Sequence, residues 1–292
     1  MKVHLAAFPK CFMDELCIKR SMTIFDWIKM ARTLDIEGVE LYNGFLPSFD
    51  ENYLQGVRGA LEAAGLEAPM FCYSPNFTEP DPLRRAKEVE AEEKIMQIAA
   101  FFRARTCRVL SGQRYPEISR QEGVRWVVEA IRSLLPKAEE LGLILAIENH
   151  YKDNYWKYPE FAQRSDIFLE ILDKIRSPWF GVNYDPSNAL IAGEDPIELL
   201  QAVKYRLVSM HASDRYLAGG TLDDLRQDSV GYASILRHGV IGQGMIDYDR
   251  IFEILQSINF NGWISIEDGM NGLDEIRESA NFLRRKIDEY SG

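Results

Sequence analysis

The sequence contains few cysteines and no apolar run of membrane-spanning length. Its four cysteines form no CxxC pair, so neither a zinc knuckle nor a dithiol redox site is indicated. Cys72 and Cys107 lie in apolar runs, where we expect buried free thiols. The N-terminal residues, MKVHLAAFPKCFMDEL, carry charges and a proline where a signal peptide needs a long apolar segment. We therefore expect a cytoplasmic protein in a reducing setting.

Positive charge is also scarce. The chain has 34 Lys and Arg residues against 45 Asp and Glu residues, and its formal net charge is −11. Binding to a phosphate backbone needs a positive surface, so we expect no nucleic-acid partner, and the lack of a spanning segment predicts no membrane partner. Arg103, Arg105 and Arg108 are expected to be solvated charges at the end of a helix and in the strand after it.

Short apolar segments alternate along the chain with longer amphipathic ones. The short segments are rich in Val, Ile, Leu and aromatic residues, which is typical of strands covered on both faces. These strands are expected at 3–8, 38–42, 68–73, 106–111, 143–148, 180–185, 207–211 and 263–267. Helical spacing predicts helices at 22–34 (with Ser21 as N-cap), 82–102, 121–141, 161–175, 196–203, 248–258 and 273–290.

This alternation predicts an α/β fold, a (β/α)₈ TIM barrel formed by a single domain over 1–292. The competing fold is an open doubly wound sheet, but the Gly-rich dinucleotide fingerprint does not follow the first strand. One connection, at about 215–245, is unusually long. Long connections of this kind are usually functional, and we expect it to form a lid or substrate clamp over the active site.

Four predicted strands in succession end in residues that bind metals: Glu148, Asp185, His211 and Glu267. Each alone has an ordinary explanation as turn chemistry or a structural histidine, but a barrel would bring all four to one point. Three converging carboxylates need a counter-charge, and this mixed oxygen and nitrogen set suits Mn²⁺, Mg²⁺, Co²⁺ or Zn²⁺. The period of two in a strand places His150 on the side of Glu148, beside the cation but not bound to it.

Six segments resemble the xylose isomerase-like TIM-barrel superfamily, the sugar phosphate isomerase/epimerase group. The resemblance implies that Glu148, Asp185, His211 and Glu267 bind one divalent metal, with Mn²⁺ the first expectation. It also implies that Glu148 and Glu267 remove and return a proton on opposite faces of the substrate, and that the chain forms a homo-oligomer. The segments are GVELY (38–42), AIENH (146–150), GVNYDPSN (181–188), MHASDR (210–215), GQGMIDYDRIFEIL (242–255) and GWISIEDG (262–269).

The activity expected from these residues is that of a metal-dependent sugar isomerase or epimerase that works through an enediolate. Asn188, Asp214, Arg215 and His238 are candidates for binding substrate hydroxyls. Arg215 could instead form a surface ion pair, and His238 could be an exposed loop histidine. The absence of a Gly-rich phosphate loop favours a free sugar or glycoside as substrate. The connection before GQG is longer than in many ketose epimerases, so the resemblance does not indicate which sugar is the substrate.

Three alternatives remain open. His150 as an acid or base beside the metal would suit a lyase, either a 3-keto-glycoside eliminase similar to C-glycoside deglycosidases or an enzyme similar to inosose dehydratases. An endonuclease IV-like repair enzyme would need several histidines for a multi-zinc cluster, whereas this chain has four in all and an acidic balance. The barrel could also be a non-enzymatic binding protein or partner subunit.

Overall fold

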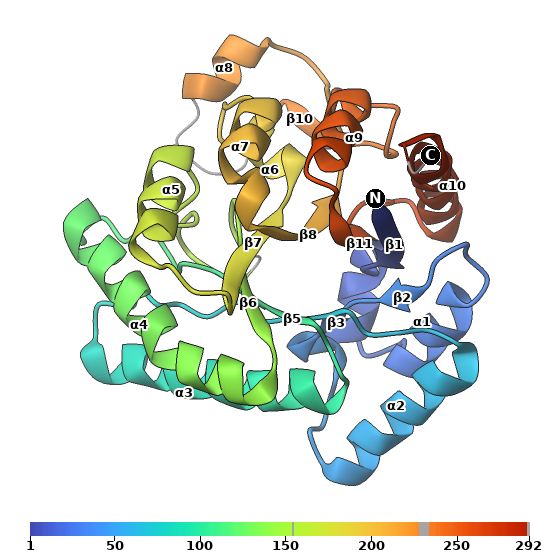
Figure 1. The fold of residues 1–292 in the computed structure, drawn as a ribbon, viewed down its shortest axis with the longest axis horizontal. Helices are drawn as coiled ribbons and strands as arrows, with labels where there is room; N and C mark the ends of the chain where they lie inside the picture. Colours follow the sequence, from blue (N-terminus) through green and yellow to red (C-terminus); the bar gives the residue numbers. More distant parts are fainter. Residues whose placement is uncertain (154, 228–233, 291–292) are drawn as a thin grey trace.

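The computed structural model describes residues 1–153, 155–227 and 234–290 and contains a parallel barrel surrounded by helices (Figure 1). Within the described residues, nine strands form one parallel sheet in the order β2-β1-β11-β8-β7-β6-β5-β4-β3. The predicted (β/α)₈ barrel is confirmed. The strands are β1 (Lys2–Ala7), β2 (Gly38–Val39), β3 (Leu41–Tyr42), β4 (Met70–Cys72), β5 (Thr106–Val109), β6 (Ile144–Glu148), β7 (Phe180–Tyr184), β8 (Leu207–Ala212) and β11 (Asn261–Ile266).

The barrel closes where the predicted strand 38–42 divides in two. β2 pairs with β1, and β3 pairs with β4. The two short strands are separated only by Glu40, whose backbone N–H donates to the Ala7 carbonyl. One short stretch of chain thus contacts both neighbouring strands and places a carboxylate inside the barrel wall.

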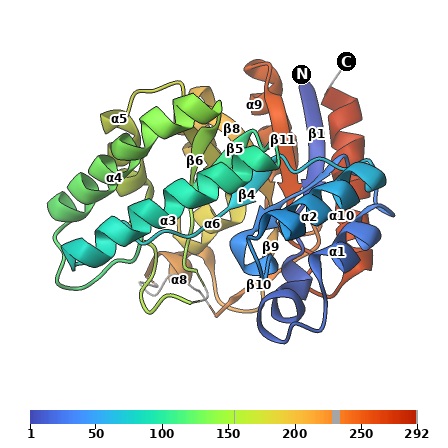
Figure 2. The same cartoon turned by 90° about the horizontal axis from the view of Figure 1, so that it is seen from below.

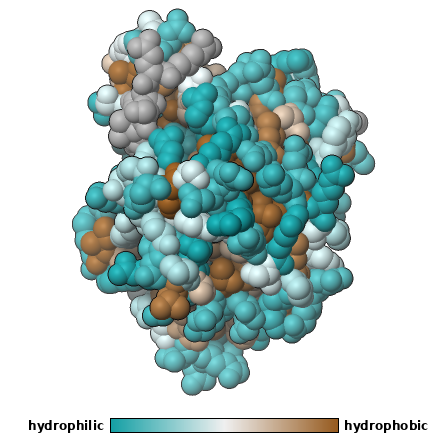
Figure 3. Space-filling view, turned by 90° about the vertical axis from the view of Figure 1, so that its left-hand side faces the viewer, coloured by the Kyte–Doolittle hydropathy of each residue, from teal (hydrophilic) through white to brown (hydrophobic). Residues whose placement is uncertain are grey.

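The helices form the outer ring (Figures 1 and 2). They turn their apolar sides toward the strands, and Figure 3 shows an outer face on which polar residues separate small apolar patches. They are α1 (Ile24–Ala31), α2 (Glu51–Ala64), α3 (Pro82–Phe101), α4 (Arg120–Leu141), α5 (Ser165–Lys174), α6 (Pro186–Ile191), α7 (Pro196–Val203), α9 (Tyr248–Ser257) and α10 (Leu273–Tyr290), with single turns η1 (Lys10–Phe12), η2 (Asp14–Ile18), η3 (Asn43–Phe45) and η4 (Lys204–Arg206). None of the helices in the described ranges is long and apolar enough to cross a membrane.

A helix cap, a loop contact and two glycines explain where the structure departs from the predicted helices. α1 begins after Thr23, which forms a capping box with Asp26, so the predicted cap at Ser21 is wrong. α5 begins at Ser165 rather than at 161, because the preceding residues pair with the loop after β5: Phe161 N–H donates to the Gly112 carbonyl. α2 was not predicted, since two glycines, Gly56 and Gly59, weaken its helical pattern.

The connection at 215–245 contains regular structure, although the sequence predicts only a long loop. β9 (Arg215–Leu217) pairs antiparallel with β10 (Leu236–His238), and α8 (Leu222–Gln227) lies between them in sequence. Figure 2 shows these elements at the end of the barrel opposite the chain termini, where the strands have their carboxyl ends. Residues 228–233 of this connection lie outside the described residues, and its role as a lid remains a prediction.

A buried carboxyl group lies outside the barrel proper, between α3 and β5. Glu92 is fully buried and accepts a hydrogen bond from the Cys107 thiol at 3.3 Å. Burial raises the pKa of Glu92 from 4.5 to about 8. The folded protein therefore holds this proton when the unfolded chain has lost it, and the free energy of unfolding falls as the pH rises from about 4.5 to about 8.

Glu92→Gln is expected to remove this part of the pH dependence. Near pH 4.5 the variant and the wild type should be about equally stable. Near pH 8 the variant should be more stable by up to about 4 kcal/mol, because the pKa of Glu92 rises from 4.5 to about 8 and each pKa unit corresponds to about 1.4 kcal/mol. Urea unfolding at the two pH values measures the difference, with exposed Glu90→Gln on the same helix as the control. Equal differences at both pH values would contradict a buried neutral Glu92.

Candidate active site

Four side chains meet at the carboxyl end of the barrel. One ligand atom from each of Glu148, Asp185, His211 and Glu267 lies within 4.8 Å of the others, and all four residues are buried. Glu148 ends β6, His211 lies in β8, and Glu267 follows β11. Asp185 follows β7 and caps α6, where its side chain accepts the Asn188 N–H. The structure thus brings together the four residues predicted to bind a metal.

Two atoms of this cluster have no hydrogen-bond partner in the part of the chain that the structure describes. His211 Nδ1 lies 3.5 Å from Glu148 Oε1 and 3.6 Å from Glu267 Oε2, and neither Nδ1 nor Asp185 Oδ2 has a hydrogen-bond partner among the described residues. Buried polar atoms are seldom left unpaired. Burial, and then the charges of Glu267 and Glu148, raise the pKa of Asp185 to about 7, a penalty that a divalent cation would offset. The residues present fit such a cation.

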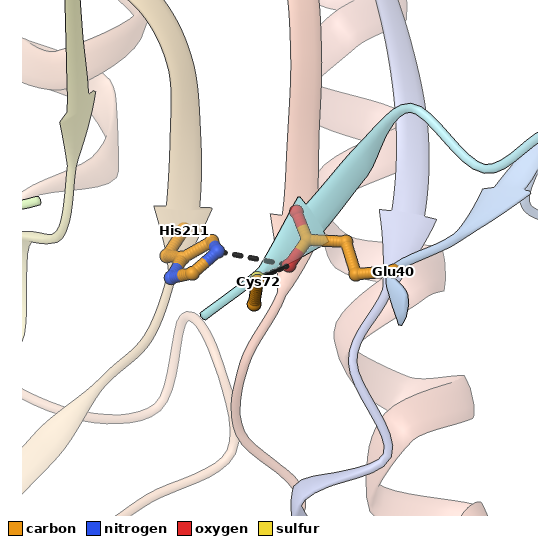
Figure 4. Close-up of side chains that lie close together, drawn as sticks. All are labelled: Glu40, Cys72 and His211. Atoms are coloured by element: carbon orange, nitrogen blue, oxygen red, sulfur yellow. Dashed lines mark hydrogen bonds and ion pairs between the residues drawn. The ribbon is translucent and has the colours of Figure 1, made fainter. Parts of the chain in front are cut away.

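The other side of the His211 ring is held by Glu40 (Figure 4). His211 Nε2 lies 2.9 Å from Glu40 Oε2, and the Cys72 thiol donates to the same oxygen at 3.7 Å. With its proton on Nε2, the imidazole presents the Nδ1 lone pair to the cluster, as in carboxylate–histidine–metal arrangements. We did not predict Glu40, although a carboxylate inside the apolar segment GVELY was a signal that could have indicated it.

Glu40→Gln is expected to weaken binding of Mn²⁺ roughly 10–100-fold, the usual cost of changing a partner that orients a histidine ligand. The charge that holds the Nε2 proton is lost, while the four cluster residues stay in place. Calorimetric titration of metal-free protein with Mn²⁺ measures the affinity. Glu67→Gln, which changes an exposed carboxylate near the other end of the barrel wall, is the control. An unchanged affinity for Glu40→Gln would exclude this role.

Two cations, buried Arg108 and partly buried Lys10, contact the two glutamates of the cluster. Arg108 Nη1 lies 2.9 Å from Glu148 Oε2, and Lys10 Nζ lies 3.4 Å from Glu267 Oε2. Without a bound cation, burial opposes protonation of His211, but Glu40, Glu267 and Glu148 raise its pKa, so its ring carries a charge. Burial opposes ionisation of Glu148, but the charges of His211 and Arg108 outweigh it and lower its pKa to about 2. Burial likewise opposes ionisation of Glu267, whose pKa is nonetheless lowered, chiefly by Lys10 and then His211. The expectation that Arg108 is solvated is wrong, because its strand, β5, points this side chain into the barrel.

His150 lines a small cavity beside the cluster, of about 70 Å³. Its ring stacks on that of Tyr151, with centroids 5.0 Å apart and an 18° angle between the planes. Burial lowers the pKa of His150, although the Glu148 charge acts in the opposite direction. A neutral imidazole at the wall of a cavity is able to accept a proton. The cavity is lined by Phe8, Lys10, Met13, Tyr42, Arg108, His150, Tyr151, Lys152, Asp153 and Glu267.

The predicted substrate-binding residues lie in different places. Asn188 reaches the cluster, where its Nδ2 donates to Glu148 Oε1 at 3.2 Å. The Asp214 carboxylate accepts backbone N–H groups of the segment 242–246 and so fastens the GQG loop. Arg215 is buried, which excludes the alternative of a surface ion pair. His238 Nδ1 lies 2.8 Å from Asp268 Oδ1. Binding of substrate by these four residues remains a prediction.

Comparison with known proteins agrees with this architecture. The family described as xylose isomerase-like TIM barrel matches residues 28–286. The inosose dehydratase of Clostridium beijerinckii is 23% identical over 59% of this chain and 56% of its own length. That of Geobacillus kaustophilus is 28% identical over 53% of this chain and 50% of its own. The chain thus spans about half the length of these curated relatives.

A solved D-tagatose 3-epimerase-like protein superimposes with a TM-score of 0.76 at 17% identity, covering 99% of this chain and 98% of that one. At this identity the likeness concerns the fold. The family match extends over most of the chain and includes the strands that carry Glu148, Asp185, His211 and Glu267. The chain belongs to the xylose isomerase-like TIM-barrel family.

Proposed function

We propose that this protein is a divalent-metal-dependent lyase that expels a β-substituent, such as water, from a keto sugar or keto polyol. The observation that carries the proposal is the pairing of Glu148 with Arg108 and of Glu267 with Lys10. These cations keep both glutamates ionised and make them weak bases. His150, a neutral imidazole beside them, is then the base. The similarity to two inosose dehydratases supports the same reaction class.

The reaction follows from the positions of the side chains. A bound cation would polarise the substrate carbonyl and stabilise negative charge on its oxygen. His150 takes the proton from the carbon next to the carbonyl, and the C–H electron pair moves toward the carbonyl oxygen. When that pair returns, it forms a carbon–carbon double bond. The β-substituent leaves with its bonding electron pair and takes up the proton that His150 received, so that a hydroxyl group departs as water. Arg108 and Asn188 hold Glu148 in place throughout.

The second candidate is the isomerase or epimerase expected from the sequence. Its supporting observation is that Glu148 and Glu267 approach the cluster from strands separated by β7 and β8 in the sheet, so they face each other across it. An epimerase needs bases on opposite sides of the substrate. The lowered pKa of both glutamates argues against that use, and we therefore favour elimination.

Reaction in deuterated water distinguishes the two. Purified protein loaded with Mn²⁺ is incubated with a cyclic keto polyol, a 3-keto glycoside and a ketose, and products are examined by mass spectrometry and NMR. Elimination predicts a conjugated ketone that has lost water or an aglycone. Epimerisation predicts an isomer of the substrate with deuterium next to the carbonyl. Asp185→Asn protein is the matched control, and failure to exchange or eliminate with all three classes would contradict both candidates.

A further inference from the structure

A second buried carboxyl group, Glu160, lies behind His150 and outside the four-residue cluster. It is fully buried. Its Oε1 accepts hydrogen bonds from the Ser111 N–H at 2.7 Å and from the Ser111 hydroxyl at 2.5 Å. Its other oxygen, Oε2, has no hydrogen-bond partner within the described ranges. Oε1 of this carboxyl group is thus satisfied by Ser111, and Oε2 is available for another hydrogen bond.

The unsatisfied oxygen faces an unsatisfied nitrogen. His150 Nδ1 lies 3.9 Å from Glu160 Oε2 and is itself buried without a hydrogen-bond partner among the residues that the structure describes. A buried polar group without a partner costs stability, so two such atoms facing each other are complementary. A shift of under about 1 Å brings them to hydrogen-bond distance.

The backbone holds both residues in this relation. The Glu160 N–H donates to the carbonyl of Tyr151 at 2.8 Å, which closes the segment that joins the two residues. The residue after Glu160 donates to Gly112, and Gln113 bridges to Glu160, so the segment is also fixed to the loop after β5. Tyr151 stacks on the imidazole from one side. Tyr151 therefore fixes the ring plane of His150, and Oε2 of Glu160 lies opposite Nδ1 of this ring.

We propose that Glu160 is a positioning residue for His150: its Oε2 accepts the Nδ1 proton, so that Nε2 carries the lone pair that takes the substrate proton. The role of His150 as base rests on the proposed function. Burial raises the pKa of Glu160 to about 8. Oε1 accepts both Ser111 hydrogen bonds, so the proton of a neutral Glu160 would lie on Oε2, and Oε2 accepts from Nδ1 when Glu160 is ionised. A fixed tautomer gives the imidazole one defined task, as in other acid–histidine pairs.

The imidazole tautomer provides a test that does not need a substrate. Nitrogen-15 NMR of wild-type protein at about pH 9, above the pKa of Glu160 of about 8, is expected to show a proton on Nδ1, with the His150 signals identified from their loss in His150→Asn. In Glu160→Gln the amide group donates to Nδ1, and the proton should move to Nε2. Glu117→Gln, an exposed change in the loop before α4, should leave the signals unchanged. A proton on Nε2 in the wild type, or the same tautomer in Glu160→Gln, would overturn the proposal.

Kinetics on a substrate that the wild type converts give the second readout. Glu160→Gln should lower kcat roughly 10²–10⁴-fold and leave KM and the affinity for Mn²⁺ within about threefold, while Glu160→Asp should recover part of kcat. An unchanged kcat, or a change in KM alone, would contradict the proposal. If Glu160→Gln does not fold, Glu160→Asp is compared with the wild type by the same two readouts. Absence of turnover by the wild type would refute the proposed function, and the tautomer measurement would still decide the role of Glu160.

Discussion

Asp185→Asn is expected to lose cation binding while gaining stability as metal-free protein. At about pH 8, the substitution removes one of three converging buried charges, whose cost is visible in the pKa of Asp185 being raised to about 7. Asn keeps the Oδ1 acceptor for the Ser213 hydroxyl and the Asn188 N–H. The affinity for Mn²⁺ should fall by more than the roughly 10–100-fold typical of outer partners, because a direct ligand is lost.

Thermal unfolding with and without Mn²⁺ measures both effects. A cation at 100 times its dissociation constant stabilises the folded wild type by about 2.7 kcal/mol, and this gain should disappear in Asp185→Asn. Without metal, the variant should unfold at a higher temperature than the wild type. Asp173→Asn, an exposed change in α5, should alter neither quantity. An Asp185→Asn variant that still gains stability from Mn²⁺ as the wild type does would show that Asp185 is no ligand.

His150→Asn is expected to abolish proton abstraction without affecting the metal. The imidazole lines the cavity, and no part of it belongs to the four-residue cluster. Loss of a general base typically costs roughly 10²–10⁴-fold in rate, so kcat and the exchange of substrate hydrogen for solvent deuterium should fall together by that amount. The affinity for Mn²⁺ should stay within about twofold of the wild type.

The control for this prediction is His4→Asn. His4 lies on β1, where its ring is tilted by 30° against that of Trp263, and it is not part of the four-residue cluster. Should His150→Asn retain full deuterium exchange, one of the two glutamates is the base, and the isomerase or epimerase becomes the better account. Should it lose Mn²⁺ binding as well, His150 acts on the metal site and not on the substrate.

The strands and the strand-end cluster could be predicted because both depend on short, local sequence patterns. Each strand is a short apolar run, and in a barrel the residues that end these runs all lie at the same end of the barrel. Glu148 and His150 could even be put on one side of β6 by counting alternate residues. The helix ends were less predictable, because capping by Thr23 competes with that by Ser21 over two residues, and only the folded chain decides between them.

The charges around the cluster could not be predicted in the same way. Lys10 contacts Glu267 across 257 positions in sequence, and Arg108 contacts Glu148 across 40. Such pairs depend on strand register and on the course of loops, which no local pattern specifies. Glu160 follows a proline in a polar connection and has no periodicity that marks it as buried. The residues that tune the cluster were therefore found only in the folded structure.

The most direct test of the account is anomalous X-ray diffraction from crystals soaked with Mn²⁺, recorded on both sides of the manganese absorption edge. We predict a single manganese peak in contact with a carboxylate oxygen of Glu148, Asp185 and Glu267 and with Nδ1 of His211. A peak held instead by Glu40 and Cys72, or no peak in the barrel at saturating Mn²⁺, would contradict it.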